Sequence, residues 1–458
     1  MPTGNQLEAV LFARLLFWVL LPIVLLAPRR WALLGWLAMT HLDATGPGLA
    51  SNANIGWINA LKSLGLPLYL CWRLRAVPSR LWHSLPARIW MLLIAYAAVA
   101  ALWSSFPLSA AKIVGNMIGI LLAVVVLEKF ARSGALDTLA LAAFVILSLG
   151  LGTVQTLVFR GTTFGFDGLD QAIRFTSFVG AQQYAALVVA LLACVLWAES
   201  LSGPRRWLLA AMLGVALVWN GSRAWCLGGL GVVLIYAWLS RRRGAGHAAL
   251  VAAGCVVLVL LGVNLGLLEA DRYWETSSRL AATLAAAFTG EDTAASAGLR
   301  NMGFRLAMYN GVLEALDSAS MPELLFGHGT SNGGLVAMTV FPRAYSIDRL
   351  DPNRVIHNEW LRALYEWGLV GFLLWGLALL GLAGGVVSCY REQGNPSPAS
   401  GALAYLPALA LALSTENILA GAGNAVTIGL SILLSFLWRT GAAGREKATA
   451  AWRETLAA

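Results

Sequence analysis

The chain has 458 residues, of which 59% are hydrophobic and 12% are charged, and its mean hydropathy is +0.71. Soluble domains carry about 25% charged residues, so this composition excludes an ordinary water-soluble domain and predicts a polytopic all-α membrane protein. The net charge of +9 comes from 28 Arg and 4 Lys, and many of the arginines lie in short loops between apolar runs. That distribution follows the positive-inside rule and gives no reason to expect nucleic acid as a partner.

Apolar runs predict about 12 transmembrane helices, since a helix needs about 20 residues to span a bilayer. The start of the chain is ambiguous, because its first two runs form either two spans or one span and a partial one. The basic loops place the carboxy terminus in the cytoplasm. The runs fall at about 7–27, 31–42, 54–72, 89–105, 109–128, 138–159, 179–198, 207–220, 222–239, 248–268, 366–388, 401–420 and 424–438.

One long polar stretch, 269–356, interrupts this pattern and is predicted to form an outer, periplasmic loop domain. It separates an amino-terminal transmembrane bundle (1–268) from carboxy-terminal transmembrane helices (357–440), and a cytoplasmic tail (441–458) follows. Within the loop, apolar residues at spacings of three and four from Leu299 to Leu316 predict a helix that lies on the membrane surface or on the bundle. A break is expected from Pro322 to Gly329, followed by a glycine-rich turn at Gly333 and Gly334.

His357 lies where this loop meets the next apolar run, and the sequence continues into that run without a helix-breaking residue. At 100° per residue, His357, Gly368 and Gly371 share one helix face, on which the glycines leave room for a substrate. Histidine moves protons readily near neutral pH. The alternative is that His357 and Asn358 only cap the helix. Glu366 falls on the opposite face, where it is expected to pair with Arg362.

Several basic residues are predicted to meet at the outer face, where the positive-inside rule makes them unusual. Arginine grips phosphate through two parallel hydrogen bonds, so such a set suits a diphosphate-linked lipid. The alternative is that each arginine pairs with a loop acid. That alternative is weaker for Arg223, which lies in a tight turn far from any acid in the sequence. The set comprises Arg174, Arg223, Arg300, Arg305, Arg354 and Lys112.

Metal chemistry has little support in the sequence, because no Asp-x-Asp motif occurs and His328 has no histidine partner at ligand spacing. His328 is expected to be a turn residue whose flanking glycines let the backbone approach another segment, such as His357. The five cysteines lie in or beside apolar runs and are read as small core residues. Glu416 is a rare membrane acid, which indicates either a functional group or a helix-packing hydrogen bond.

Together, the turn Asn220-Gly-Ser-Arg-Ala-Trp225, an Arg-bearing loop helix with a following Gly-His-Gly, and the run from His357 to Gly371 resemble the O-antigen ligase/O-antigen polymerase superfamily. The member type that the chain is most similar to is the bacterial O-antigen ligase. The resemblance implies a GT-C-like fold in a Gram-negative inner membrane, with the active site facing the periplasm. It implies transfer of O-antigen from undecaprenyl diphosphate to a terminal sugar of lipid A–core, with inversion, without a metal and without a cofactor.

Residue by residue, Arg223 and Arg305 match the two family arginines, and His357 matches the histidine at the end of the loop, the expected catalytic residue. Arg174, Arg300 and Lys112 are expected to add to diphosphate binding, and His328, Asn358 and Arg354 to act as accessory groups.

Three alternatives stay open. An O-antigen polymerase would use the same donor with a second lipid-linked chain as acceptor, and a protein O-oligosaccharyltransferase would use a polypeptide. A transporter of lipid-linked sugars would need polar residues and broken helices near the bilayer midplane, whereas the charges here cluster at one face.

Overall fold

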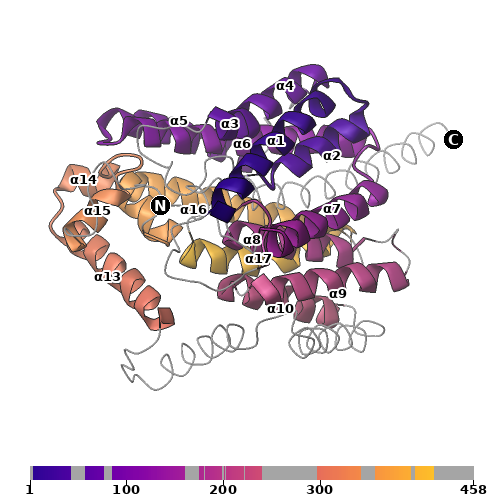
Figure 1. Cartoon of the computed structure of the whole chain (residues 1–458). Helices are drawn as coiled ribbons and strands as arrows, with labels where there is room; N and C mark the ends of the chain where they lie inside the picture. Colours follow the sequence, from indigo (N-terminus) through magenta and orange to yellow (C-terminus); the bar gives the residue numbers. More distant parts are fainter. Residues whose placement is uncertain are drawn as a thin grey trace.

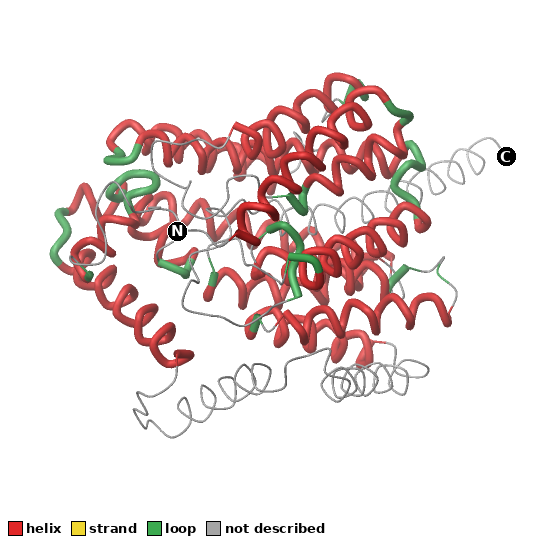
Figure 2. The backbone as a smooth tube through the Cα atoms, in the orientation of Figure 1, coloured by secondary structure: helices red, strands yellow, loops and turns green. Residues whose placement is uncertain are grey.

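The computed structural model describes residues 4–42, 57–76, 85–159, 175–179, 181–198, 201, 203–220, 222–239, 297–341, 356–393 and 398–416. Within these ranges the regular elements are helical, and an isolated parallel bridge joins Leu42 to Phe178 (Figure 2). The helices of the amino-terminal half are α1 (Gly4–Leu26), α2 (Arg29–Met39), α3 (Trp57–Ala60), η1 (Leu61–Gly65), α4 (Leu66–Arg73), α5 (Leu85–Ala100), η3 (Ala101–Trp103), α6 (Pro107–Arg132) and α7 (Thr138–Leu157). The later helices are α8 (Ala181–Leu196), α9 (Gly203–Asn220), α10 (Arg223–Leu239), α13 (Ala297–Asp317), α14 (Met321–Phe326), α15 (Gly333–Val340), α16 (Glu359–Gln393) and α17 (Pro398–Thr415).

Five of the described helices are long and apolar enough to cross a membrane, which supports a multi-pass membrane protein. They correspond to predicted runs, whereas the predicted runs 248–268 and 424–438 and the cytoplasmic tail lie outside the described residues. The count of about 12 spans therefore stays a prediction. The five candidate spans are Glu8–Leu26, Leu85–Trp103, Pro107–Arg132, Thr138–Leu157 and Glu359–Glu392.

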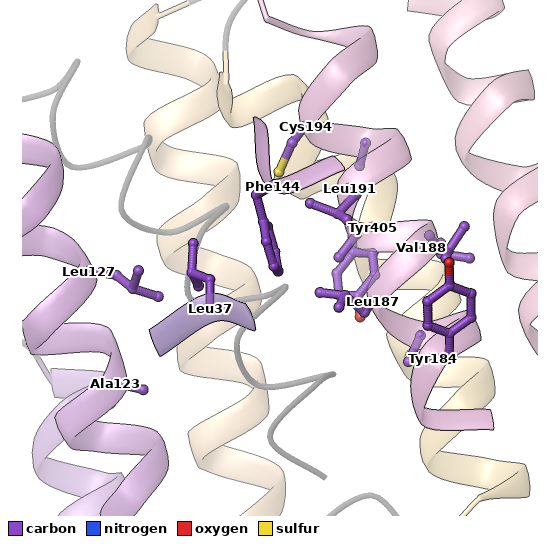
Figure 3. Close-up of a cluster of buried hydrophobic side chains, with 14 of the residues drawn as sticks. Leu37, Ala123, Leu127, Phe144, Tyr184, Leu187, Val188, Leu191, Cys194 and Tyr405 are labelled. Atoms are coloured by element: carbon purple, nitrogen blue, oxygen red, sulfur yellow. The ribbon is translucent and has the colours of Figure 1, made fainter. Parts of the chain in front are cut away.

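Helix α8 forms the centre of the bundle, because every side chain from Tyr184 to Trp197 is buried. A helix whose side chains are buried on every side is surrounded by other helices rather than by lipid. Figure 3 shows its Leu187, Leu191 and Cys194 among side chains of other helices, including Phe144 of α7 and Tyr405 of α17. The core therefore sits where α8 meets α7, α9, α10 and α17.

Close glycine contacts fix the directions of the helices around α8. Gly229 of α10 lies against Val189, and Gly228 of α10 lies against Ala408 of α17. Gly401, near the start of α17, lies against the carbonyl of Ala193, near the end of α8. Helix α17 thus runs antiparallel to α8. The turn before α10 lies at the start of α8, because the Asn220 amide donates to the carbonyl of Phe175, whose ring contacts Tyr184. Helix α10 therefore begins at the end of the bundle where α17 finishes.

Arginines gather at the opposite end of the bundle, the predicted cytoplasmic side. Arg73 donates to the carbonyls of Val24 and Ala27 at the end of α1, at 2.9 and 2.7 Å. Arg30 pairs with Asp137, which also caps α7 by accepting from the amide of Ala140 at 2.8 Å. Cations near helix carboxy-termini satisfy free carbonyls and oppose the negative end of the helix dipole.

The helix predicted from Leu299 to Leu316 is confirmed as α13, and its Met308 and Val312 are buried in a small core with Ile356 and Tyr365. The predicted break after it is shorter than expected, because Met321–Phe326 is helical and the chain is non-helical only from Gly327 to Asn332. The predicted glycine turn at Gly333 and Gly334 was wrong. Ser320 and Glu323 form a capping box with Pro322 in the first turn, which starts α14. Gly333 and Gly334 begin α15. In Figure 1, α13, α14 and α15 lie together on one side of the bundle, beside the region where α16 is drawn.

Candidate functional site

His357 precedes α16 and has a left-handed backbone, with φ of +52°. Asn358 caps the helix, since its side-chain oxygen accepts from the amides of Trp360 and Leu361 at 3.0 and 3.1 Å. The capping interpretation is therefore correct for Asn358. The prediction that His357 lies on a helix face with Gly368 and Gly371 was wrong, because His357 is outside the helix.

Helix α16 is also broken at Gly368, where φ is +60° and ψ is −167°. A side chain at Gly368 would lie 2.5 Å from backbone atoms of Leu325 and Gly327, and one at Gly371 would meet the side chain of Trp367 at 2.2 Å. These two glycines thus make room for other parts of the protein. The expectation that they leave room for a substrate was wrong.

The Gly327-His328-Gly329 segment packs on this kink. The amides of His328 and Gly329 donate to the carbonyls of Tyr365 and Glu366 at 3.0 and 2.9 Å. The His328 ring stacks on Tyr365 with centroids 4.2 Å apart and an interplanar angle of 9°. The predicted close approach of the glycines is confirmed, but they approach the kink of α16 rather than His357.

Glu366 connects α16 to the start of α15, next to the Gly327-His328-Gly329 segment. Its carboxylate accepts from the amide of Gly333 at 3.1 Å and is fully buried. Arg362 forms an ion pair with Glu359, and both side chains are almost completely buried. Arg362 thus pairs directly with Glu359, one turn earlier in the helix, and its charge also acts on Glu366, the partner predicted from the sequence.

Beside His357, α13 contacts the end of α17. Arg305 donates to the carbonyl of Thr415 at 2.8 Å, and its guanidinium lies 3.8 Å from a carboxylate oxygen of Glu416. The hydroxyl of Tyr309, one turn along α13, donates to the carbonyl of His357 at 3.0 Å. We call Arg305, Tyr309, His357, Asn358 and Glu416 the outer cluster. Sequence reasoning flagged Glu416 as a rare membrane acid, but nothing local in the sequence identifies Arg305 as its partner.

The environment of His357 favours the neutral imidazole. Partial burial lowers the pKa of His357, and the nearby Arg305 guanidinium lowers it further, to about 3. At neutral pH the ring is therefore uncharged and able to accept a proton. An anion bound to Arg305 would offset part of the charge that holds this pKa down, so the basicity of His357 depends on what Arg305 contacts.

The remaining predicted site residues are placed only in part. Arg223 begins α10 and Arg300 lies in the first turn of α13, but their side chains are outside what the structure describes. Arg174 and Arg354 lie outside the described residues. Lys112 is half-buried in the second turn of α6. Since α10 begins at the end of the bundle where α17 finishes, Arg223 shares that end with the outer cluster.

A second polar group, missed by sequence reasoning, lies inside the bundle. The two ring nitrogens of His41 lie 3.0 Å from the Ser177 hydroxyl and 2.9 Å from the Ser148 hydroxyl. Lys62, which is 1% exposed, donates to the carbonyl of Leu42. We call His41, Lys62, Ser148 and Ser177 the buried cluster. The lone lysine within the apolar run 54–72 was the available signal.

Irregular backbone surrounds the buried cluster. Helix α2 has 11 residues, too few for a span, and stops just before His41. Lys62 lies in the π-helical turn η1, a rare conformation that is frequent at functional sites. Ser148 is near the middle of the α7 candidate span, and Ser177 lies just before α8 begins.

Among the described residues, no group of three or more His, Cys, Asp or Glu side chains is arranged to hold a metal ion. Cys71, Cys194, Cys226 and Cys389 form no disulfide within the described part of the chain, and the fifth cysteine, Cys255, lies outside it.

Residues 207–376 match the model of a family described as O-antigen ligase. The match confirms the resemblance seen in the sequence and indicates an activity of the O-antigen ligase or polymerase type. No curated protein matches the chain.

The O-antigen ligase match contains the whole outer cluster except Glu416, together with Arg223, Arg300, His328 and Arg354. Two of the residues predicted to contact the diphosphate, Lys112 and Arg174, precede the matched segment. The buried cluster also lies before it, so the family match says nothing about the role of that cluster.

Proposed function

We propose that the protein is an O-antigen ligase that transfers O-antigen polysaccharide from undecaprenyl diphosphate to a terminal sugar of lipid A–core. The reaction takes place at the periplasmic face of a Gram-negative inner membrane, within a GT-C-like bundle of about 12 helices. The observation that carries the proposal is the contact between α13, which bears Arg305, and His357, whose carbonyl accepts a hydrogen bond from Tyr309 of α13. A cation suited to phosphate, Arg305, and a neutral histidine, His357, are held at one end of the bundle within the family segment.

The arginines bind the leaving group in this mechanism. Breaking the bond between the anomeric carbon and the diphosphate oxygen leaves its electron pair on the diphosphate, whose charge grows. Fixed guanidinium groups stabilise that charge without a metal. Arg305 and Arg223 are the proposed principal contacts, with Arg300, Arg174 and Lys112 as further ones. Glu416 holds Arg305 in place, and the anionic donor shares that guanidinium when it binds.

His357 acts on the acceptor. The acceptor hydroxyl oxygen attacks the anomeric carbon while its proton passes to the neutral imidazole of His357. One displacement on the side opposite the leaving group inverts the anomeric configuration, and no covalent sugar–enzyme intermediate forms. The released undecaprenyl diphosphate departs as the dianion or trianion that Arg305 has stabilised.

The test uses purified protein in vesicles with lipid-linked O-antigen and one acceptor at a time. Lipid A–core, a second lipid-linked O-antigen and an acceptor polypeptide are supplied in separate reactions, and products are followed by gel shift. We expect elongated lipid A–core and inverted linkage by NMR. Elongation of the lipid-linked chain alone would make the protein a polymerase, and modification of the polypeptide alone would make it a protein O-oligosaccharyltransferase.

The buried cluster favours a second candidate function, transport of a lipid-linked sugar. Transporters place polar residues beside broken helices at mid-membrane depth. His41 and Lys62 likewise lie beside irregular backbone, at the end of α2 and in η1. A transporter would move a fluorescent lipid-linked sugar across vesicles without changing it chemically. Transport that persists in His357→Ala and is lost in Lys62→Met would favour this function over ligation.

A further inference from the structure

The left-handed backbone of His357 is not explained by the proposed role of its side chain. A left-handed conformation is unfavourable for a residue with a side chain, and such residues persist where the surroundings hold them. Ile356, on one side, is anchored in the core with Met308 and Val312. Asn358, on the other side, is fixed as the cap of α16. The carbonyl of His357 itself is held by Tyr309.

Tyr309 also lies against α17. Its hydroxyl oxygen is 3.5 Å from the carbonyl of Ser414, the residue before the Thr415 carbonyl that accepts from Arg305. Arg305 and Tyr309 are four residues apart on α13 and share a face. One face of α13 therefore contacts two successive carbonyls at the end of α17 and also the carbonyl of His357.

We propose that Tyr309 is a positioning residue, which fixes His357 at a set separation from Arg305 by donating to the His357 carbonyl. This rests on the proposed function, in which His357 and Arg305 act on the same glycosidic bond from opposite sides. Burial raises the pKa of Tyr309 above its ordinary value, so the hydroxyl keeps its proton and remains a donor. Loss of the hydroxyl would leave the ring packed on α13 but release the peptide of His357.

The experiment measures turnover of Tyr309→Phe in vesicles with lipid-linked O-antigen and lipid A–core. A reacting group displaced by about 1 Å can lose about 100-fold in rate, so we expect kcat to fall between about 10-fold and 100-fold. The KM for the donor should change little, because Arg305 keeps its own contacts. Tyr309→4-aminophenylalanine retains a donor at the same reach and should recover most of the rate.

Tyr69→Phe is the matched control. It removes a hydroxyl that donates to the carbonyl of Leu25 at 2.7 Å, at the opposite end of the bundle. Both variants lose one tyrosine–carbonyl hydrogen bond between segments that are far apart in the sequence. A drop in kcat of the same size in Tyr69→Phe would mean that the loss reflects general destabilisation, and it would overturn the proposal.

A double-mutant cycle with His357→Ala separates the failure of this proposal from failure of the proposed function. If Tyr309 acts through His357, Tyr309→Phe has no further effect once His357 is alanine. The role of Tyr309 is overturned if Tyr309→Phe lowers kcat by the same factor in the wild-type and the His357→Ala backgrounds. It is also overturned if Tyr309→Phe has a normal kcat while His357→Ala is slow. Either result leaves the proposed function intact. Normal turnover in His357→Ala overturns both.

Discussion

The outer cluster and the buried cluster each place a histidine near a cation, yet their surroundings differ. His41 is fully buried, and both of its ring nitrogens lie within hydrogen-bond distance of a serine hydroxyl. His357 is half-buried, has a left-handed backbone and is held by its own carbonyl. The cations differ as well, since Lys62 is almost inaccessible while 18% of the Arg305 side chain is exposed.

The difference indicates that the buried cluster stabilises irregular backbone, whereas the outer cluster can contact a substrate. Lys62 satisfies the carbonyl of Leu42, just beyond the end of α2, and His41 joins that end to α7 and the 175–179 segment. Buried polar groups of this kind must be paired, because an unpaired one is costly in a low-dielectric interior. The outer cluster combines partial exposure with backbone strain, which is typical of sites where geometry serves a reaction.

The largest expected effect is that of His357→Ala. Removal of a general base typically costs 10²–10⁴-fold, so turnover should fall by about that range while the variant still folds and binds the lipid diphosphate. The comparison variant His41→Gln should instead lower the melting temperature and keep nearly normal turnover per folded molecule. Turnover and donor binding of both purified proteins check this. Normal turnover in His357→Ala would mean that His357 has only a structural role, at the start of α16.

A smaller effect is expected from Arg305→Lys, which keeps the charge but loses the planar fork. Hydrogen bonds to charged groups are worth about 1.5–3 kcal/mol, which corresponds to roughly 10-fold to 100-fold in transfer rate. Arg73→Lys is the matched control, since Arg73 also donates to helix-end carbonyls but at the opposite end of the bundle. Equal rates in wild type and Arg305→Lys would contradict two-pronged phosphate binding by this residue.

Composition and hydrophobic periodicity predicted the all-helical membrane fold, and α5, α6, α7 and α13 lie close to their predicted positions. They did so because burial in lipid dominates the energetics of such segments. The kink at Gly368 could not be predicted in this way, because it depends on the backbone of Gly327 lying against it. A glycine in an apolar run looks the same whether or not another segment of the chain packs on it.

In the candidate site, too, the sequence predicted some of the residues but not the long-range contacts that position them. The sequence named Arg305, His357 and Asn358 from a motif, and the structure places the three together. Tyr309 appeared in the sequence only as one member of an apolar stripe, since its partner lies 48 residues away along the chain. The pairs of Arg305 with Glu416 and of His41 with Ser148 span still longer separations. Such contacts follow from packing that no local pattern encodes.

A change in pH should distinguish the free site from the donor-bound site. Burial and Arg305 lower the pKa of His357 to about 3, and transfer needs the neutral ring, so the rate falls as pH drops through that pKa. In the free enzyme kcat/KM should therefore stay level well below pH 6. A diphosphate on Arg305 offsets the positive charge and raises the pKa of His357, so kcat should fall at a higher pH than kcat/KM. If kcat and kcat/KM fell at the same pH, the result would contradict electrostatic coupling between His357 and Arg305.

The smallest expected effect is that of chelation. In the proposed mechanism the guanidinium groups of Arg305 and Arg223 supply the positive charge that a divalent metal would otherwise bring to the diphosphate, and the sequence has no Asp-x-Asp pair to hold such a metal. Excess EDTA should therefore leave the rate of transfer unchanged. If the rate fell and Mg²⁺ or Mn²⁺ restored it, the arginines would be assisting a metal rather than replacing it. In that case Arg305→Lys should show its loss only when the metal is limiting, and measuring that variant with and without Mg²⁺ would decide between the two roles.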